Sequence, residues 1–529
     1  MLDLIIKNAF ILDGNGRPGY CGNVGVLNGK IAVVGRAEYE AAETVDASGL
    51  ALAPGFIDVH AHGDLFAHVD SLCASKLRQG ITTEIAGQCG MGPAPVSTET
   101  LSVYKSYYEK QGVLLYPRAN AFTAFSAYME ELSHIQRGIH TALFVPHGTL
   151  RIAVMGFSSA APDVAQLSSM RALLDEGMQA GALGLSAGLM YAPGSFTQPD
   201  ELLFLCEIAA KYGGIYTSHL RNQGDLLIES VEEALQMGEH TGVKVNISHH
   251  KAAGRNNWGK VQKTSAMLAL ARKNGIGATH DVYPYTASST TLSSTLPPSC
   301  MKEGIEPLLA HLSDPGYTAA LEKRIFNPTE EWENSLLECG YHSILIFLAP
   351  ATPTAEGKSI AQYAETEGIA PFEAYIRLLT ENKLAVGDIC FSMEQKDVDF
   401  LITEPYCMFG TDALYVEGMK TTHPRAIGTF PRILGRSVRE KGLLSLEEAV
   451  RKMTSLAADT YRLNGKGRIE TGYDADLTLF DPDRIIDHAD YTNPLAPNAG
   501  IARVYVDGIL ALLNGEPTGS RNGRVLKRG

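Results

Sequence analysis

The sequence lacks paired cysteines, an excess of positive charge and long apolar runs. Its eight cysteines are scattered without paired spacing, which excludes a disulfide framework and is typical of a reducing compartment. The formal net charge is -14, so neither nucleic acid nor an anionic membrane surface is expected as a partner. No apolar stretch approaches the ~20 residues of a membrane helix, and the N-terminus lacks a signal-peptide pattern. These absences predict a soluble, cytoplasmic protein.

The chain also lacks a glycine-rich phosphate loop near its start, which argues against an open, doubly wound sheet. Its middle part instead alternates helical and strand patterns in repeats of about 30 residues, the arrangement of a parallel sheet buried on both faces. The helical patterns open on Asp or close on Gly, and each short apolar strand pattern ends in polar residues. We therefore predict an α/β fold in which a (β/α)₈ TIM-like barrel forms the core.

The two ends of the chain differ from this middle part. Residues 1–53 and the far C-terminus are both rich in short strand patterns joined by turns, so we expect one small β-sandwich domain built from both termini. The barrel is expected over 54–425, and 426–529 would hold the last barrel helix region and the C-terminal part of the β domain. The stretch from about 287 to 350 is longer than a crossover requires, which predicts an inserted subdomain or lid.

Two histidines, His60 and His62, follow an apolar strand pattern in "PGFIDVHAHGD". Residues i and i+2 of a strand face the same side, so both imidazoles can reach one metal ion. Taken alone, such a pair is as consistent with ordinary surface or core histidines as with metal ligands.

Other polar side chains stand where predicted barrel strands end, and the C-terminal strand ends of such barrels carry the active site. Imidazoles, a carboxylate and a thiolate are ligands that zinc accepts. Cys89 lies in the glycine-rich "IAGQCGMGPAP", so we hypothesise that it is a metal-ligating thiolate; the alternative is a buried, inert thiol. Strand alternation aims only one of His249 and His250 into the barrel, and the residues leave open which. The strand-end groups are Cys89, His219, His249 with His250, Tyr283 and Asp412.

The motif "PGFIDVHAHGD" resembles the signature of the metal-dependent amidohydrolase superfamily. The segments "GQCGMGPAP", "SHLRNQGD", "ISHHKAAG", "DVYPYTAS" and "HPRAIGTFPRILG" resemble the D-aminoacylase (N-acyl-D-amino-acid deacylase) branch. The similarity runs nearly end to end and includes the C-terminal "GRIETGYDADLTLFD". Together these motifs are specific for the family, whereas a single one is not.

The resemblance implies one tightly held Zn²⁺ on Cys89, His219 and His249, and so favours His249 over His250. A second, weaker site would use His60 and His62, with the thiolate able to bridge. Hydantoinase-like relatives carry a bridging carboxylated lysine, and "GALGLSAGLMYAPG", where such a lysine would sit, contains none.

The catalytic and substrate-binding roles follow from the same resemblance. Asp412 would act as general base and then general acid; the alternative is an Asp that caps a helix or a turn. Arg425 could grip the substrate carboxylate through its planar fork, and Lys251, Tyr191 and Tyr283 occupy similar substrate-binding positions. Surface ion pairs or core packing are the alternatives for these four. Further polar residues, His147 and His423, fit structural roles, and Asp58 and Asp281 could orient the ligand histidines.

The leading hypothesis is zinc-dependent hydrolysis of N-acyl-D-amino acids, small-molecule substrates, to a carboxylate and a free D-amino acid. The stereochemistry is inferred from the resemblance alone. The alternatives are a cyclic-amide hydrolase of the D-hydantoinase or dihydroorotase type, a D-specific dipeptidase, and a non-catalytic scaffold with the same fold. The oligomeric state and the preferred side chain are not predicted.

Overall fold

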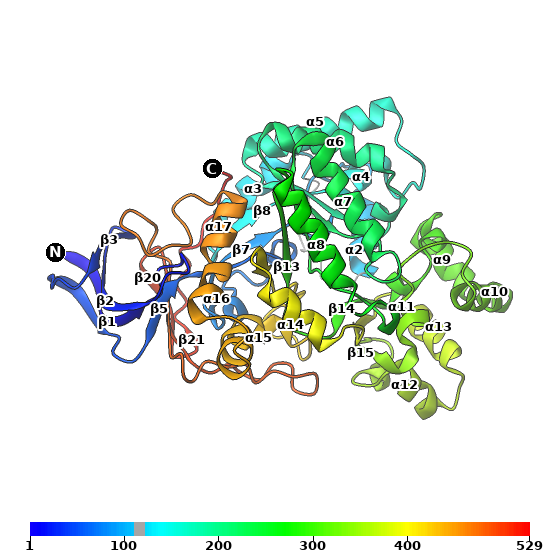
Figure 1. Cartoon of the computed structure of the whole chain (residues 1–529). Helices are drawn as coiled ribbons and strands as arrows, with labels where there is room; N and C mark the ends of the chain where they lie inside the picture. The colour runs from blue at the N-terminus through cyan, green and yellow to red at the C-terminus, as the bar shows by residue number, and fades with distance from the viewer. Residues whose placement is uncertain (111–121) are drawn as a thin grey trace.

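A computed structural model of the chain describes residues 1–110 and 122–529 (Figure 1). Its centre consists of short parallel strands that are buried along nearly their whole length. One parallel sheet has the order β6-β7-β8 and a second the order β17-β13-β12-β11-β10-β9. Only Phe144 separates β8 from β9, and the Val59 N–H donates to the Phe409 carbonyl at 3.2 Å, which links the end of β6 to β17. The strands are β6 (Phe56–Asp58), β7 (Ile81–Ala86), β8 (His140–Leu143), β9 (Val145–Pro146), β10 (Gly184–Gly188), β11 (Ile215–His219), β12 (Lys244–Ile247), β13 (Ala278–Val282) and β17 (Cys407–Phe409).

Helices connect these strands and cover the outside of the parallel sheets (Figure 1). The capping that the sequence predicts is present: Asp163 accepts from the Gln166 N–H at the start of α5, and Gly181 and Gly242 end α5 and α7 in the left-handed conformation. The helices are α1 (Ala74–Leu77), α2 (Leu101–Lys110), α3 (Phe125–His134), α4 (His147–Met155), α5 (Val164–Ala180), α6 (Pro199–Lys211), α7 (Leu227–Thr241), α8 (Lys260–Lys273), α14 (Gln395–Thr403), α15 (Arg425–Arg432), α16 (Leu446–Met453) and α17 (Ser455–Tyr461), with a π-helical stretch at Ile433–Glu440.

Both termini contribute to the small β domain, seen at the left of Figure 1. Its nine strands form one hydrogen-bonded sheet, where the sequence predicts the two sheets of a sandwich. The reason is β5, which pairs with β1 in parallel and with β18 in antiparallel fashion and so joins the two halves. The strands are β1 (Leu2–Ile11), β2 (Tyr20–Leu27), β3 (Lys30–Gly35), β4 (Ala41–Asp46), β5 (Ala51–Pro54), β18 (Leu477–Phe480), β19 (Ile501–Val506), β20 (Ile509–Leu513) and β21 (Glu516–Pro517).

A further unit lies between β13 and β17 and projects to the right in Figure 1. A three-stranded antiparallel sheet, β14-β16-β15, packs with helices around an apolar core that includes Leu308, Ile346 and Tyr375 and extends to Tyr104 and Tyr108 of α2. Because β16 pairs back onto β14, the unit runs as far as Cys390. Its elements are β14 (Ser288–Thr291), α9 (Ile305–Leu312), α10 (Pro315–Phe326), α11 (Ser335–Cys339), β15 (Ile344–Leu348), α12 (Ile360–Glu367), α13 (Pro371–Glu381) and β16 (Gly387–Cys390).

A buried ionic cluster joins the parallel sheets to the β domain. His140, the first residue of β8, lies with its Nε2 3.1 Å from Asp476 Oδ1, next to β18. The ammonium of Lys466 lies 2.5 Å from Asp476 Oδ2 and 2.9 Å from Asp474 Oδ2. The cluster therefore sits at the N-terminal end of the parallel strands.

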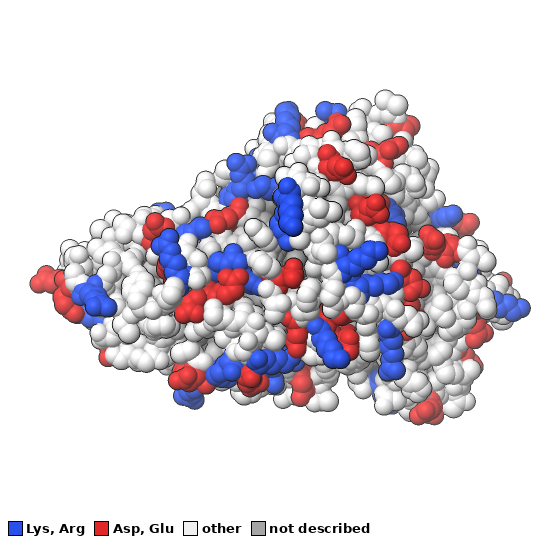
Figure 2. All heavy atoms as spheres, viewed as in Figure 1, with Lys and Arg blue, Asp and Glu red and all other residues white. Residues whose placement is uncertain are grey.

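The surface shows no concentration of one charge on the face seen in Figure 2, where basic and acidic side chains are interspersed. Among the described residues, no helix combines the length and the hydropathy of a membrane span.

Candidate metal centre

The glycine-rich loop after β7 is held tightly against its neighbours. Gly87 and Gly90 both have positive φ, and a Cβ on Gly87 would lie 2.5 Å from the Phe144 carbonyl oxygen. A Cβ on Gly90 would lie 2.9 Å from the Gly188 nitrogen, so both positions require glycine. Cys89 between them also has a left-handed backbone (φ 54°), a conformation that side chains rarely adopt outside constrained sites. The loop thus fixes the position of the thiol.

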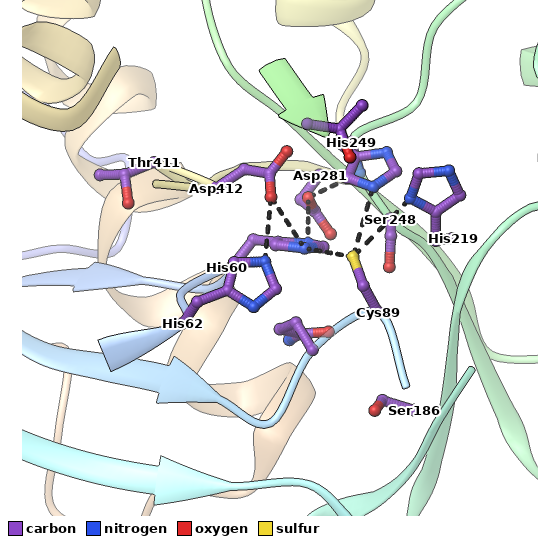
Figure 3. Close-up of polar contacts among 12 residues, drawn as sticks. His60, His62, Cys89, Ser186, His219, Ser248, His249, Asp281, Thr411 and Asp412 are labelled. Atoms are coloured by element: carbon purple, nitrogen blue, oxygen red, sulfur yellow. Dashed lines mark hydrogen bonds and ion pairs between the residues drawn. The ribbon is translucent and has the colours of Figure 1, made fainter. Parts of the chain in front are cut away.

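The Cys89 sulfur is the meeting point of three imidazoles (Figure 3). Its Sγ lies 3.2 Å from His60 Nε2, 3.6 Å from His249 Nε2 and 3.8 Å from His219 Nδ1. All of these side chains are buried. Two potential ligand groups share the sulfur: Cys89 with His219 and His249, and Cys89 with His60, His62 and Asp412.

Asp412 follows β17 and faces the two histidines of the His-x-His motif. Its Oδ1 lies 3.2 Å from His62 Nε2 and 3.5 Å from His60 Nε2, and its Oδ2 accepts from Arg425 Nη1 at 2.8 Å. Its backbone is left-handed (φ 48°) and its N–H donates to the His60 carbonyl. The backbone therefore holds the carboxylate against the metal-ligand candidates.

His249 and His250 have different surroundings, which settles a choice that the residues alone leave open. His249 points its Nε2 to Cys89, and its positive φ of 35° interrupts the strand geometry at the end of β12. His250 lies 2.8 Å from the Thr264 hydroxyl of α8 through its Nε2 and packs against the His280 ring. The structure thus brings His249 into the cluster and turns His250 toward a helix.

A carboxylate beneath the cluster orients its histidines. Asp281 Oδ1 lies 3.1 Å from His60 Nδ1 and accepts from the His249 backbone N–H at 2.8 Å. Such outer contacts fix the ring orientation of metal-ligating histidines. Asp58 plays a different part, because it accepts from the backbone N–H of Thr411 at 2.8 Å and pairs with the Lys76 ammonium.

The charges of the cluster suit a cation. Burial raises the pKa of Cys89, but His60 and the other imidazoles outweigh burial and bring it well below the usual value for a thiol. Burial likewise raises the pKa of Asp412, and the Arg425 guanidinium and His60 more than reverse this. Burial lowers the pKa of His62, yet contact with Asp412 and the thiolate brings it up to about 9. A metal ion bound to this set would take the place of the imidazole protons.

The four predicted substrate-binding residues surround the same centre. The Arg425 guanidinium lies 4.7 Å above the Tyr283 ring, and its Nη2 donates to the Ser289 carbonyl at 3.0 Å. Lys251 donates to Gln223 Oε1 at 2.6 Å and lies 2.9 Å from His249 Nδ1, and burial lowers its pKa to about 8. The Tyr191 hydroxyl lies 3.1 Å from the Thr290 hydroxyl of β14.

Two cavities adjoin these groups. A small one of about 30 Å³ touches His219, His249 and Asp412 together with Tyr191, Lys251 and Tyr283. A larger, mostly apolar one of about 620 Å³ is lined by Arg425 and shares Ser289 and Thr290 with the small one. The reacting groups therefore lie between the parallel strands and the inserted unit.

The other polar candidates have structural partners. His147 contacts Glu201 at 2.8 Å and is not one of the potential metal-ligand groups. His423 contacts the Ala287 carbonyl and accepts from the Arg425 backbone N–H at 3.0 Å, so it positions that residue.

Three site residues escaped the sequence prediction: Gln223, Glu333 and Asp388. Gln223 lies four positions after His219, within "SHLRNQGD", and contacts the His219 ring at 3.0 Å. This spacing was a usable signal. Glu333 and Asp388 come from the inserted unit, where no local sequence pattern indicates proximity to the parallel strands.

Comparison with known proteins gives a consistent picture. The Amidohydrolase family model matches residues 43–321 and 358–510. The N-acyl-D-aspartate deacylase of Alcaligenes xylosoxydans xylosoxydans is 35% identical over 100% of this chain and 95% of its own length. The D-aminoacylase of the same organism is 32% identical over 99% and 98%. A crystal structure of N-acyl-D-glutamate deacylase from Bordetella bronchiseptica, complexed with zinc and a phosphonate mimic of the tetrahedral intermediate, superposes with a TM-score of 0.84 at 33% identity and covers 99% of both chains.

Proposed function

The chain belongs to the amidohydrolase family, and we propose that it is a zinc-dependent enzyme that hydrolyses N-acyl-D-amino acids to a carboxylate and a free D-amino acid. The observation that carries this proposal is the convergence of one thiolate with four histidines and the Asp412 carboxylate. Similarity to deacylases over the full length of the chain supports the same reaction.

The donor set fits zinc, since thiolate sulfur, imidazole nitrogen and carboxylate oxygen are its preferred ligands. Cys89, His219 and His249 would hold the tightly bound ion. His60 and His62 would hold a second, weaker one, with Cys89 able to bridge. When bound, zinc lowers the pKa of water to about 7 and polarises the amide carbonyl.

Asp412 is the group that moves protons. Its low pKa keeps the carboxylate ionised, so Oδ1 can take a proton from the attacking water and deliver it to the departing amide nitrogen. Arg425 on Oδ2 prevents rotation of the carboxylate and leaves Oδ1 toward the histidines.

The substrate's free carboxylate has a suitable binding surface in Lys251, Tyr283 and Arg425. Among the described residues, the buried Tyr283 hydroxyl and Arg425 Nε have no hydrogen-bond partner. Buried polar atoms normally have a hydrogen-bond partner, so these two donors are available to bind a ligand. Tyr191, whose ring packs 4.7 Å from the His219 ring, would border the scissile bond.

We also infer the architecture that holds this site. The parallel strands occupy eight positions, which is the number in a TIM barrel. Seven positions are taken by single strands and one is shared by β8 and β9; the single strands are β6, β7, β10, β11, β12, β13 and β17. The hydrogen bond from Val59 to Phe409 supports closure of the ring. The β domain would then comprise residues 1–53 with the C-terminal part of 426–529, the barrel 54–425, and the unit from β14 to β16 an insertion over its mouth.

The test is the release of free amino acid from matched N-acetyl D and L forms of methionine, leucine and glutamine. Zinc-loaded enzyme should act on the D series only, and a chelator should abolish the release. Faster opening of hydantoins, cleavage of D-dipeptides alone, or turnover of the L series would contradict the proposal.

A further inference from the structure

We propose that Asp388 and Glu333 form an acidic wall of the substrate side-chain subsite. This wall favours N-acyl-D-amino acids whose side chains donate a hydrogen bond over those with an isosteric carboxylate. The inference rests on the proposed function and adds to it the class of side chain that the site accepts.

The two acids of the wall line the same small cavity as the reaction centre. His219, His249 and Asp412 line this cavity together with Glu333, which precedes α11, and Asp388 of β16. Both acids are buried, with 7% and 1% of their surfaces exposed. A substrate bound at the metal ligands would therefore place one of its substituents next to these two carboxyl groups.

The carboxyl group of Asp388 has an oxygen that could accept a further hydrogen bond. Within the described part of the chain its Oδ1 contacts no donor, although the atom is fully buried. Burial also raises the pKa of Asp388 to about 7. A buried acceptor without a partner destabilises the protein, and an amide or hydroxyl donor on a ligand would remove that cost.

The charges around the cavity point to the same preference. Glu333 accepts from the Gln223 backbone N–H at 2.8 Å, which fixes its carboxyl group at the wall. The Arg425 guanidinium is paired with Asp412, and Lys251 is needed for the substrate's α-carboxylate. A second substrate carboxylate would thus meet two acids without a free cation among the described lining residues, which is unfavourable in a site of low dielectric. The inferred preference is therefore opposite to the acidic side chains that the names of the aspartate and glutamate deacylases indicate.

The test compares isosteric substrates: N-acetyl-D-glutamine with N-acetyl-D-glutamate, and N-acetyl-D-asparagine with N-acetyl-D-aspartate. With the zinc-loaded, full-length enzyme, kcat/KM for each amide should exceed that for its acid by about 10-fold or more. The variant Asp388→Asn should bring both ratios toward one, mainly through faster hydrolysis of the acids. Glu333→Gln, a second variant, should shift them in the same direction.

Glu330→Gln is the matched control, because Glu330 belongs to the same inserted unit but pairs with Arg324 and Ser299. It should leave both ratios unchanged. Acids cleaved as fast as amides by the wild type, or ratios unaltered in folded, zinc-replete Asp388→Asn and Glu333→Gln, would overturn the inference. In those cases N-acetyl-D-leucine and N-acetyl-D-methionine would still be cleaved; failure on these substrates as well would instead refute the proposed function.

Discussion

Two buried clusters of histidine and carboxylate side chains lie at opposite ends of the parallel strands, and they differ in what stands at their centres. At the C-terminal ends the central group is the Cys89 thiolate, an anion in contact with three imidazoles. At the N-terminal end it is the Lys466 ammonium, a cation between Asp474 and Asp476.

The difference shows why similar residue types produce different roles. His140, Asp476 and Asp507 have the spacing of a metal site, yet the Lys466 ammonium already lies among them: its Nζ is 2.9 Å from His140 Nε2, 2.5 Å from Asp476 Oδ2 and 3.6 Å from Asp507 Oδ1. The Cys89 cluster instead combines a thiolate and a carboxylate with imidazole nitrogens, a donor set that could hold a metal ion in place of the imidazole protons. We therefore propose that the first cluster binds the metal and that the second holds the parallel sheets and the β domain together.

Replacement of the central anion should have the largest effect. Cys89→Ala removes the ligand common to both metal groups, so tightly bound zinc should be lost and kcat/KM should fall by about 10³-fold or more. Elemental analysis of zinc per chain, together with a deacylation assay, measures both effects. Cys206→Ala, at a buried thiol of α6, is the control and should keep its zinc. Full activity of Cys89→Ala would remove the bridging thiolate from the mechanism.

Asp412→Asn separates proton transfer from metal binding within the same cluster. The amide cannot accept the proton of the attacking water, so kcat should fall by about 10²- to 10⁴-fold. Zinc per chain should stay as in the wild type, because the thiolate and His219 with His249 remain. Asp399→Asn, at an exposed ion pair with Lys441, is the control. A parallel loss of zinc would show that Asp412 acts as a ligand and not primarily as a base.

The sequence was informative wherever a site residue sits at a strand end. His60 and His62 lie two apart after β6, His219 ends β11, and the structure brings all of them to the Cys89 sulfur. The family assignment is confirmed by relatives over the whole chain. Periodicity was sufficient here because parallel strands deliver their C-terminal ends to one place.

Periodicity was insufficient where the chain leaves regular geometry. The left-handed backbone at His249 decides which of two adjacent histidines enters the cluster, and no strand pattern encodes it. Asp388 reaches the site only because β16 pairs with β14, a contact between segments far apart in the chain. The single sheet of the β domain depends likewise on β5, which pairs on both edges.

Removal of the Lys466 ammonium should lower the stability of the protein and leave catalysis unchanged. Lys466→Met leaves Asp474 and Asp476 buried without their main counter-ion, which should reduce the free energy of unfolding by about 3–5 kcal/mol. Urea unfolding measures the change, and kcat of the folded enzyme should remain as in the wild type. The exposed pair of Lys441 with Asp399 provides the control, since Lys441→Met should cost about 1 kcal/mol or less. A fall in zinc content of Lys466→Met would break the division of roles between the clusters.

The smallest effect should come from Asp476→Asn, and its pH dependence identifies the cause. Burial raises the pKa of Asp476, but Lys466 and His140 outweigh burial and hold it below the unfolded value near 4. The folded state therefore binds this proton less tightly than the unfolded state, so the charge contributes stability above about pH 4 and loses it as the pH falls toward the folded pKa. At pH 7 the free energy of unfolding of the wild type should exceed that of Asp476→Asn by about 1–3 kcal/mol. This difference should shrink steadily below about pH 4. Urea unfolding of both proteins across this range gives the curve, with the exposed Asp483→Asn as a control that stays flat. A difference that is independent of pH would mean that Asp476 stabilises the junction through packing, and the second cluster would no longer be an ionic counterpart of the first.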